Sequence, residues 1–186
     1  MTTIKPLALE EVDPKLREML QPTVDRLGYF GEFFQYGAQA PGVLTGFMQY
    51  SGALKAAIPD DLNEALALTV CAHLGLDYER IQHERLAVKL GLARDWIATM
   101  VGCSDTATLT PAQQATRALA IAVSDGKIAE AREAAARLAT EAGEAVAVAA
   151  LFQATRFVAV CVIGRVFDLQ LPITSIFAEE APASAG

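Results

Sequence analysis

Residues 60–91 read DDLNEALALTVCAHLGLDYERIQHERLAVKLG, and this stretch decides the fold that the sequence predicts. Apolar residues recur at helical spacing on both sides of a glycine-containing break at residues 75–77, which indicates two consecutive helices. Asp60 or Asp61 is expected to cap the first helix, and Asp77 the second. The chain therefore has a helix pair at its centre, and the other segments are expected to pack around it.

Polar residues interrupt the apolar faces of this pair. Glu79 and His83 are four residues apart in the second helix, so their side chains lie side by side at the head of its apolar face. At a rise of about 1.5 Å per residue, Glu64 lies roughly 16 Å and His83 roughly 12 Å from the break. Folding the pair back on itself then brings Glu64 within about one turn of His83. Four charged residues fall on other faces and are expected to be solvated: Arg80, Glu84, Arg85 and Lys89.

A carboxylate beside a histidine orients the imidazole ring and raises its pKa, which suits general acid or base catalysis near neutral pH. Glu64, Tyr78, Glu79 and His83 therefore form the candidate site. Each also has a structural explanation: the glutamate–histidine contact can be a stabilising pair, an acid in a first helical turn complements the helix dipole, and a tyrosine ring can simply be packed. His73 is out of phase with Glu64 and is expected to point away, so no metal site is predicted.

The composition of the chain excludes some classes of function. Of the 186 residues, 53% are apolar and 20% charged, and the net charge of −7 comes without the basic stripe of nucleic-acid-binding proteins. The three cysteines form no CxxC pattern and the first residues do not resemble a signal peptide, so a cytoplasmic protein is expected. Cys71 is predicted to be a small buried apolar residue. The most apolar segment, 145–167, carries Gln153 and two arginines, which favours a buried core helix over a membrane span.

Cap, proline and glycine signals divide the rest of the chain into further helices. The expected ranges are 14–27, 41–57, 93–101, 111–124, 127–140 and 144–168, which gives about seven or eight helices in all and no strand. Residues 28–37 hold five aromatic side chains between glycines and are predicted to form a loop, either packed over the core or serving as the wall of a pocket. We expect an all-α fold in a single domain, residues 1–177, with an extended lead-in at 1–12 and a mobile tail at 178–186.

The helix pair resembles the core motif of the carboxymuconolactone decarboxylase and alkylhydroperoxidase D superfamily. The matching residues run from a helix-initial glutamate to Tyr-Glu-x-x-x-His and then Gly-Leu: Glu64, Tyr78, Glu79, His83, Gly91 and Leu92. The peroxidase branch of that family carries two cysteines twelve and fifteen residues after the glutamate, where this chain has Leu76 and Glu79. The chain is therefore similar to the branch that lacks the CxxC redox pair.

This resemblance implies a helical bundle of the alkylhydroperoxidase D-like type, a homo-oligomer (commonly a trimer or hexamer), and a small-molecule substrate without a cofactor. It also implies acid–base chemistry of the lactone-decarboxylase type on an organic acid or lactone. His83 would act as general base or acid, Glu64 as its orienting or proton-relaying partner, and Glu79 as a second carboxylate. Tyr78 would donate a hydrogen bond to a developing enolate-like oxygen. Arg156 is the candidate cation for a substrate carboxylate, unless it pairs with a structural acid.

Two other functions fit the same residues. A thiol-dependent peroxidase that uses Cys71 alone requires this thiol to be accessible and to have a low pKa. A non-catalytic oligomeric ligand-binding protein of the same fold is favoured if His83 is sealed in the core with no adjoining cavity. Neither a nucleic acid nor a membrane is expected as a partner.

Overall fold

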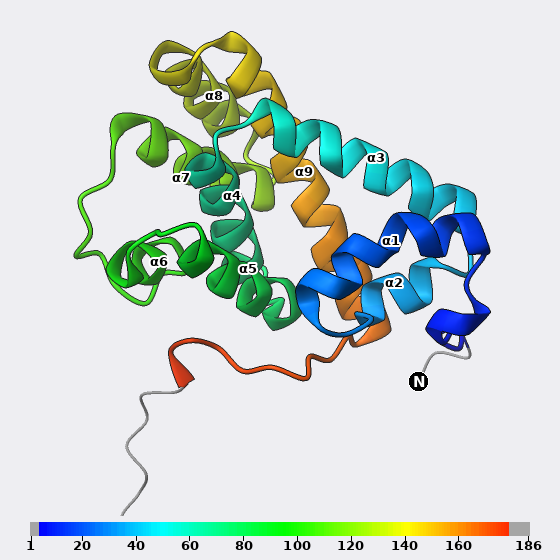
Figure 1. The fold of residues 1–186 in the computed structure, drawn as a ribbon. Coiled ribbons are helices and arrows are strands. Elements are labelled where there is room, and N and C mark those ends of the chain that lie inside the picture. The colour runs from blue at the N-terminus through cyan, green and yellow to red at the C-terminus, as the bar shows by residue number, and fades with distance from the viewer. Residues whose placement is uncertain (1–3, 179–186) are drawn as a thin grey trace, which may run out of the picture.

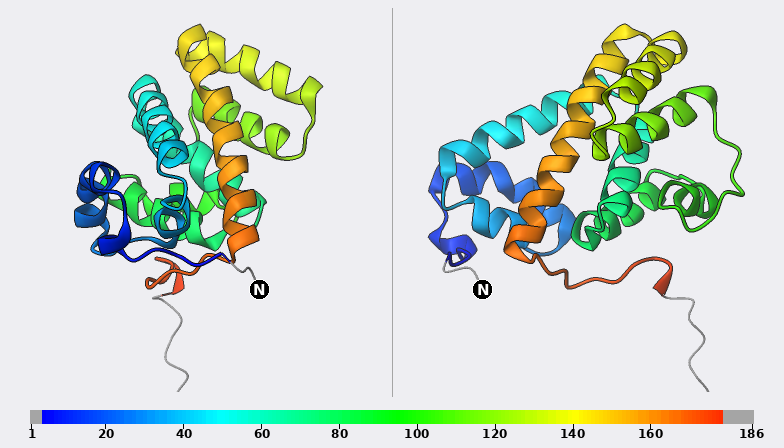
Figure 2. Two further views of the ribbon diagram at one scale, coloured as in Figure 1. Left: turned by 90° about the vertical axis from the view of Figure 1, so that its right-hand side faces the viewer. Right: turned by 180° about the vertical axis from the view of Figure 1, so that it is seen from behind.

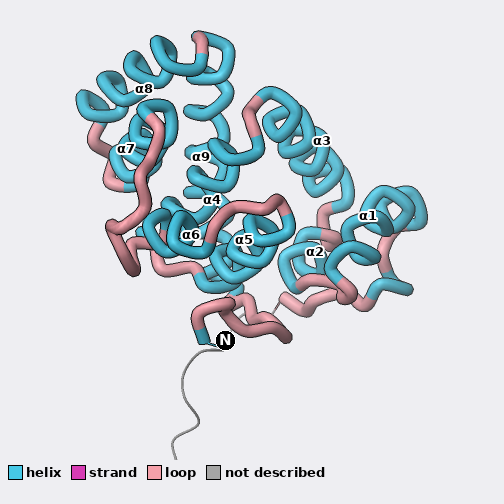
Figure 3. Tube along the Cα trace, turned by 60° about the vertical axis from the view of Figure 1, so that its left-hand side comes forward, coloured by secondary structure: helices cyan, strands magenta, loops and turns pink. Residues whose placement is uncertain are grey.

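The computed structural model describes residues 4–178 and shows nine α-helices, a 3-10 turn and no strand within that range (Figure 3). The elements are η1 (Leu9–Glu11), α1 (Pro14–Leu27), α2 (Glu32–Gly37), α3 (Pro41–Ala57), α4 (Asp60–His73), α5 (Asp77–Lys89), α6 (Arg94–Met100), α7 (Pro111–Ser124), α8 (Ile128–Ala142) and α9 (Glu144–Phe167). The all-α prediction is confirmed. Most of the predicted tail at 178–186 lies outside the described residues.

Helix α4 lies at the centre of the molecule, between α5, α6, α7 and α9 (Figure 1). Ten consecutive residues of this helix, 62–71, are buried. An ordinary surface helix buries one stripe only, so burial around the whole circumference means that other helices cover every side of α4. The stretch that decides the fold is therefore also its most enclosed element.

Two short elements were not expected from the sequence. Residues 32–37, predicted as part of a loop, form the helix α2, and η1 falls within the predicted extended lead-in. Gly28 ends α1 with a left-handed backbone, φ 80°, and Gly31 begins α2 three residues later. The aromatic side chains of α2 supply the packing that stabilises so short a helix, since Phe33 is buried and its ring contacts the Phe47 ring on α3 at 5.3 Å between centroids.

The predicted caps of the central pair, Asp60 or Asp61 and Asp77, were wrong by one or two residues. The residue that precedes α4 is Pro59 and the residue that precedes α5 is Leu76, and neither offers a side-chain cap. Asp60 and Asp77 instead occupy the first helical turns, where a carboxylate complements the positive end of the helix dipole. Side-chain caps do occur elsewhere, for example at Thr110, whose hydroxyl accepts from the Gln113 backbone N–H at 3.2 Å.

The longest helix, α9, packs against α3, α4, α7 and α8 and runs the length of the molecule (Figure 2). By length and composition alone it could cross a membrane, and 44% of its most apolar window is buried within the structure. Its inner face carries part of the main hydrophobic core, including Phe157 and Cys161. A second, smaller core cluster lies under α6 around Trp96.

After α9 the chain turns back and runs beneath α5 towards α6 (Figures 1 and 2). Glu84, predicted to be solvated, is fully buried by this returning segment. Its carboxylate accepts hydrogen bonds from Ser175 Oγ at 2.6 Å, from the backbone N–H of Ile176 at 3.2 Å and from the Arg80 guanidinium. The prediction failed because the covering residues lie about ninety positions later in the chain, beyond the reach of helical periodicity.

Candidate active site

His83 lies between two carboxylates that come from the two central helices. Its Nδ1 donates to Glu64 Oε2 at 2.7 Å, and its Nε2 lies 3.6 Å from Glu79 Oε2. The proximity of Glu64 and His83 predicted from their distances to the break is thus confirmed, as is the side-by-side placement of Glu79 and His83. The Glu64 side chain is 1% exposed, whereas the side chains of His83 and Glu79 are 14% and 17% exposed. The Glu64–His83 pair therefore reaches solvent on the side that faces Glu79.

These carboxylates keep His83 charged at neutral pH. Burial alone would lower the pKa of His83, but the charge of Glu64, its hydrogen bond and the contact with Glu79 outweigh burial and raise the pKa to about 9. The Phe157 ring packs edge-on against the imidazole ring, at 5.2 Å between centroids, and also restricts its orientation. His83 is therefore a positioned imidazolium, able to donate a proton from Nε2.

A chain of buried amides holds the second oxygen of Glu64. Asn63 Nδ2 donates to Glu64 Oε1 at 3.0 Å, Gln153 Nε2 donates to Asn63 Oδ1 at 2.6 Å, and Arg156 Nε donates to Gln153 Oε1 at 2.7 Å. Because arginine has no acceptor and the carboxylate no donor, every amide in this relay can adopt only one orientation. Asn63 and Gln153 were not predicted as site residues, although a glutamine within an apolar helix was a visible signal.

Arg156 lies where it can support this relay, and it lines neither of the two cavities described below. Its guanidinium lies over the Phe157 ring, 4.1 Å from the centroid, and 5.5 Å from that of Phe47. Within residues 4–178 no carboxylate oxygen comes within 4.0 Å of it, and burial lowers its pKa. The structure thus places Arg156 with neither the structural acid nor the substrate pocket that the sequence suggested.

Tyr78 closes the site on the side of α2. Its hydroxyl oxygen accepts from the backbone N–H of Phe33 at 3.2 Å, which leaves the hydroxyl proton for donation. Burial raises the pKa of Tyr78 well above its ordinary value, so the phenol stays neutral. A Cβ atom on Gly31 would lie only 2.6 Å from this hydroxyl, so glycine permits the approach of α2 to Tyr78.

Two neighbouring cavities open beside these groups. The inner one, about 110 Å³, is lined by acid–base residues and aromatic rings: Tyr78, Glu79, His83, Phe33 and Phe34, together with Arg26, Leu27, Gln82 and Leu86. The outer one, about 450 Å³, shares Arg26, Leu27, Gln82 and Leu86 with it. Three of the four predicted site residues therefore line one cavity, while the fourth, Glu64, lies behind His83.

The cysteines and the second histidine line neither of these two cavities. Cys71 is fully buried, as predicted, and its Sγ lies 3.8 Å from Cys161 Sγ. Burial, followed by the contact with Cys161, raises the pKa of the Cys71 thiol, which is the opposite of what a peroxidatic thiol needs. His73 points away from Glu64 and pairs with Asp125 at 2.6 Å. Among the described residues, histidine, cysteine and acidic side chains nowhere gather in threes able to hold a metal ion.

Comparison with known proteins supports the fold through structure alone. No protein-family model and no curated protein sequence matches the chain. A cysteine variant of the debrominase Bmp8 in complex with 2,3,4-tribromopyrrole is 19% identical, with a TM-score of 0.73 and 91% of each chain covered. An uncharacterised peroxidase-related protein from Ralstonia eutropha JMP134 with an alkylhydroperoxidase AhpD core is 16% identical, with a TM-score of 0.74, 89% of this chain and 91% of that chain covered. The chain thus has the AhpD-like fold.

Proposed function

We propose that this AhpD-like chain is a small-molecule enzyme that transfers protons on an organic acid or lactone, as its resemblance to the branch without CxxC suggests. The observation that carries the proposal is the geometry of His83, with Glu64 on one ring nitrogen and Glu79 facing the other at a cavity. This arrangement is that of an oriented acid–base pair, in which a buried carboxylate fixes the ring and a second one meets the substrate.

The charge state of His83 assigns the roles of acid and base to His83 and Glu79. Below its raised pKa His83 is an imidazolium, so it serves as the acid, and Glu79 is the base. Glu79 takes a proton from the carbon next to the substrate carbonyl, while His83 Nε2–H and the Tyr78 hydroxyl bind the oxygen on which negative charge develops. If the substrate instead loses carbon dioxide, the electrons of the broken bond move to the same oxygen, and His83 supplies the proton that returns to carbon.

The alternatives have less support in the structure. A peroxidase that uses Cys71 needs an accessible thiol of low pKa, and Cys71 is buried with a raised pKa. A binding protein with a sealed histidine needs His83 without an adjoining cavity, and His83 lines one. Bmp8, which shares the fold, holds a small aromatic ligand, in keeping with a small molecule as the ligand of this chain.

The direct test is turnover of 4-carboxymuconolactone and related γ-lactones by the purified protein, followed by the loss of substrate absorbance. His83→Gln and Glu79→Gln are each expected to lower kcat by about 10²- to 10⁴-fold, the range typical of general acid–base groups. His73→Gln is the matched control, because the other histidine of the chain pairs with Asp125 away from the cavities. An inactive wild type, or a His83→Gln variant as active as wild type, would show that the proposal is wrong.

We also propose that the chain forms a homo-oligomer, because the outer face of α9 exposes large apolar side chains. Six of its exposed residues alternate four and three positions apart, as in the seam between packed helices: Val148, Phe152, Thr155, Ala159, Val162 and Val166. A contiguous exposed apolar surface of this kind is typical of a contact surface. A second copy of the chain offers the same stripe, so the two α9 helices can pack against each other in a self-complementary contact.

A further inference from the structure

The charged side chains among the described residues that line the outer cavity are all cationic, although the chain as a whole is acidic. The chain has a net charge of −7, yet four cationic side chains line this cavity: Arg26, Arg85, Lys89 and Arg94. None of the described residues that line it is acidic. A concave surface with one sign of charge concentrates ligands of the other sign, so this cavity favours anions.

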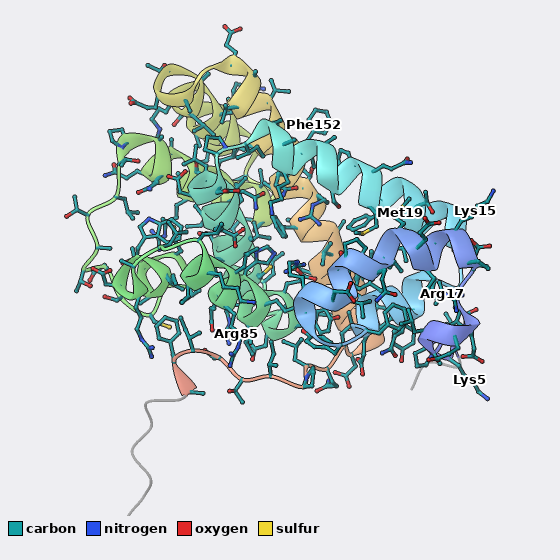
Figure 4. The ribbon with its side chains drawn as sticks, in the orientation of Figure 1. Lys5, Lys15, Arg17, Met19, Arg85 and Phe152 are labelled. Atoms are coloured by element: carbon teal, nitrogen blue, oxygen red, sulfur yellow. The ribbon has the colours of Figure 1, made fainter. Side chains whose placement is uncertain are left out.

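One side of the cavity is formed by the segment that follows α9, through Ile173 and Ile176. Arg85 donates to the carbonyl oxygen of Thr174 at 3.0 and 2.7 Å, and Arg94 donates to that of Ile176 at 2.7 Å. Figure 4 shows Arg85 on α5 above this segment. Together with the buried Glu84, these bonds hold the segment in place, so that Ile173 lines the cavity beside Ile176.

The rest of the lining is largely aliphatic. Its aliphatic residues are Leu27, Leu86, Val88, Ile173 and Ile176. A volume of about 450 Å³ lies within the usual range for small-molecule sites. Hydrocarbon walls combined with cations fit an organic anion with an apolar body better than a small inorganic ion.

Arg26 connects this cavity to the acid–base groups, since of the four cations it alone lines the inner cavity as well. Gln82, also shared by both cavities, is held in place because its Oε1 accepts from the Tyr29 hydroxyl at 3.2 Å and its Nε2 donates to the Tyr78 carbonyl at 2.9 Å. Apart from Arg26, the charged groups at the inner cavity are the Glu79 carboxylate, the His83 imidazolium and, behind it, the Glu64 carboxylate. Two negative charges against one positive charge repel an anionic group. An anionic substrate would therefore place its charge outside, at Arg26, and its reacting end inside.

We propose that the outer cavity is the subsite for the carboxylate of an organic acid with a hydrocarbon body, and that Arg26 is the side chain that binds this carboxylate. The planar guanidinium can form two parallel hydrogen bonds with a carboxylate, which fixes the direction of the bound molecule as well as its charge. This subsite deepens the proposed function. The binding of the carboxylate stands without that function, and only the placement of the reacting end of the substrate in the inner cavity rests on the proposed function.

The test is a titration of the ¹⁵N-labelled protein, with amide chemical shifts as the readout and hexanoate, its neutral isostere hexanamide and inorganic phosphate as the probes. Hexanoate is expected to bind saturably and to shift the amides around Leu86 and Ile176. Hexanamide is expected to bind about tenfold more weakly, since a charge-assisted bond is replaced by a neutral one. Phosphate that binds as tightly as hexanoate would overturn the preference for an organic acid.

Arg26→Gln is expected to weaken the binding of hexanoate by about tenfold and to leave the binding of hexanamide unchanged. Arg17→Gln on the same helix is the control, and Figure 4 shows Arg17 towards the far end of α1 from Arg85. Equal binding of hexanoate by wild type and Arg26→Gln would refute the subsite. Because binding is measured without turnover, hexanoate binding in a protein that converts no lactone would refute the proposed function and leave the subsite standing.

Discussion

His83 is the residue whose charge links the folding of this chain to its proposed chemistry. Two glutamates hold its pKa at about 9, against about 6.5 for an unfolded histidine. Between these values the folded chain keeps a proton that the unfolded chain has lost. The stabilisation is therefore complete below about pH 6.5 and disappears as the pH rises through about 9.

We predict that wild type loses on the order of 3 kcal/mol of unfolding free energy between pH 6.5 and 9 through this one residue, at about 1.4 kcal/mol per pKa unit. His83→Gln cannot bind the proton, so its stability should change much less over the same interval. Urea denaturation of both proteins at several pH values gives the comparison. Parallel curves for the two would mean that His83 is not held as an imidazolium.

The amide relay behind Glu64 allows a second prediction, which concerns the pKa of His83. Gln153→Met keeps the shape of the side chain but removes the bonds to Asn63 and Arg156, so Asn63 is no longer held towards Glu64. Glu64 then stabilises the imidazolium less well. We expect the pKa of His83 to fall by about one unit, comparable to the loss of one hydrogen bond to a charged group.

The measurement is the titration of histidine ring signals by NMR, which is simple because the chain has only two histidines and His73→Gln assigns them. Leu138→Ala on α8 is the control, since it removes a fully buried core side chain outside the relay. It should destabilise the fold and leave the pKa of His83 unchanged. An unchanged pKa in Gln153→Met as well would reduce the relay to a structural role.

At the scale of elements, the site depends on how closely α2 approaches α5. A methyl group at Gly31 would lie 2.6 Å from the Tyr78 hydroxyl, on a ring packed in the core. We expect Gly31→Ala to displace the ring, to break its bond with Phe33 N–H and to cost about 1–3 kcal/mol of unfolding free energy, as overpacking does. Thermal and urea denaturation measure this cost.

Gly52→Ala is the comparison for that variant. Gly52 lies within α3, and a Cβ added there meets no atom within 4 Å. Alanine should therefore stabilise the helix by up to about 1 kcal/mol, so the two glycine substitutions are expected to have opposite signs. If both substitutions stabilise the protein, α2 does not constrain Tyr78.

At the scale of the molecule, the outer stripe of α9 should decide the state of association. Phe152, labelled in Figure 4, and Val162 are 53% and 57% exposed. Changing both to lysine would place charges in the proposed contact between copies. We expect light scattering after size exclusion to show an oligomer for wild type and a shift towards monomer for this variant.

Val43→Lys is the control for the stripe, because Val43 on α3 is 74% exposed and lies outside it. It should associate as wild type does. A wild-type protein that is monomeric over the whole concentration range contradicts the proposal, and its partition into lipid vesicles would assign the stripe to a membrane surface instead.

The sequence by itself determined the helices other than α2, and the register of the central pair. Asp13-Pro14, Thr110-Pro111 and Gly143 set helix ends through contacts within a few residues, and the spacing of Glu64 and His83 about the break placed them together. Such features depend on backbone geometry within a few turns, which is written locally in the chain.

Only the tertiary structure decided what surrounds those helices. Asn63 and Glu84 each bond to a group 90 or more positions away, at Gln153 and in the returning segment, and no local period specifies these partners. The burial of Glu84, the orientation of Glu64 and the two cavities follow from how distant helices pack. The sequence of a helix shows which of its faces is apolar, but the packing of the whole chain determines which element covers that face.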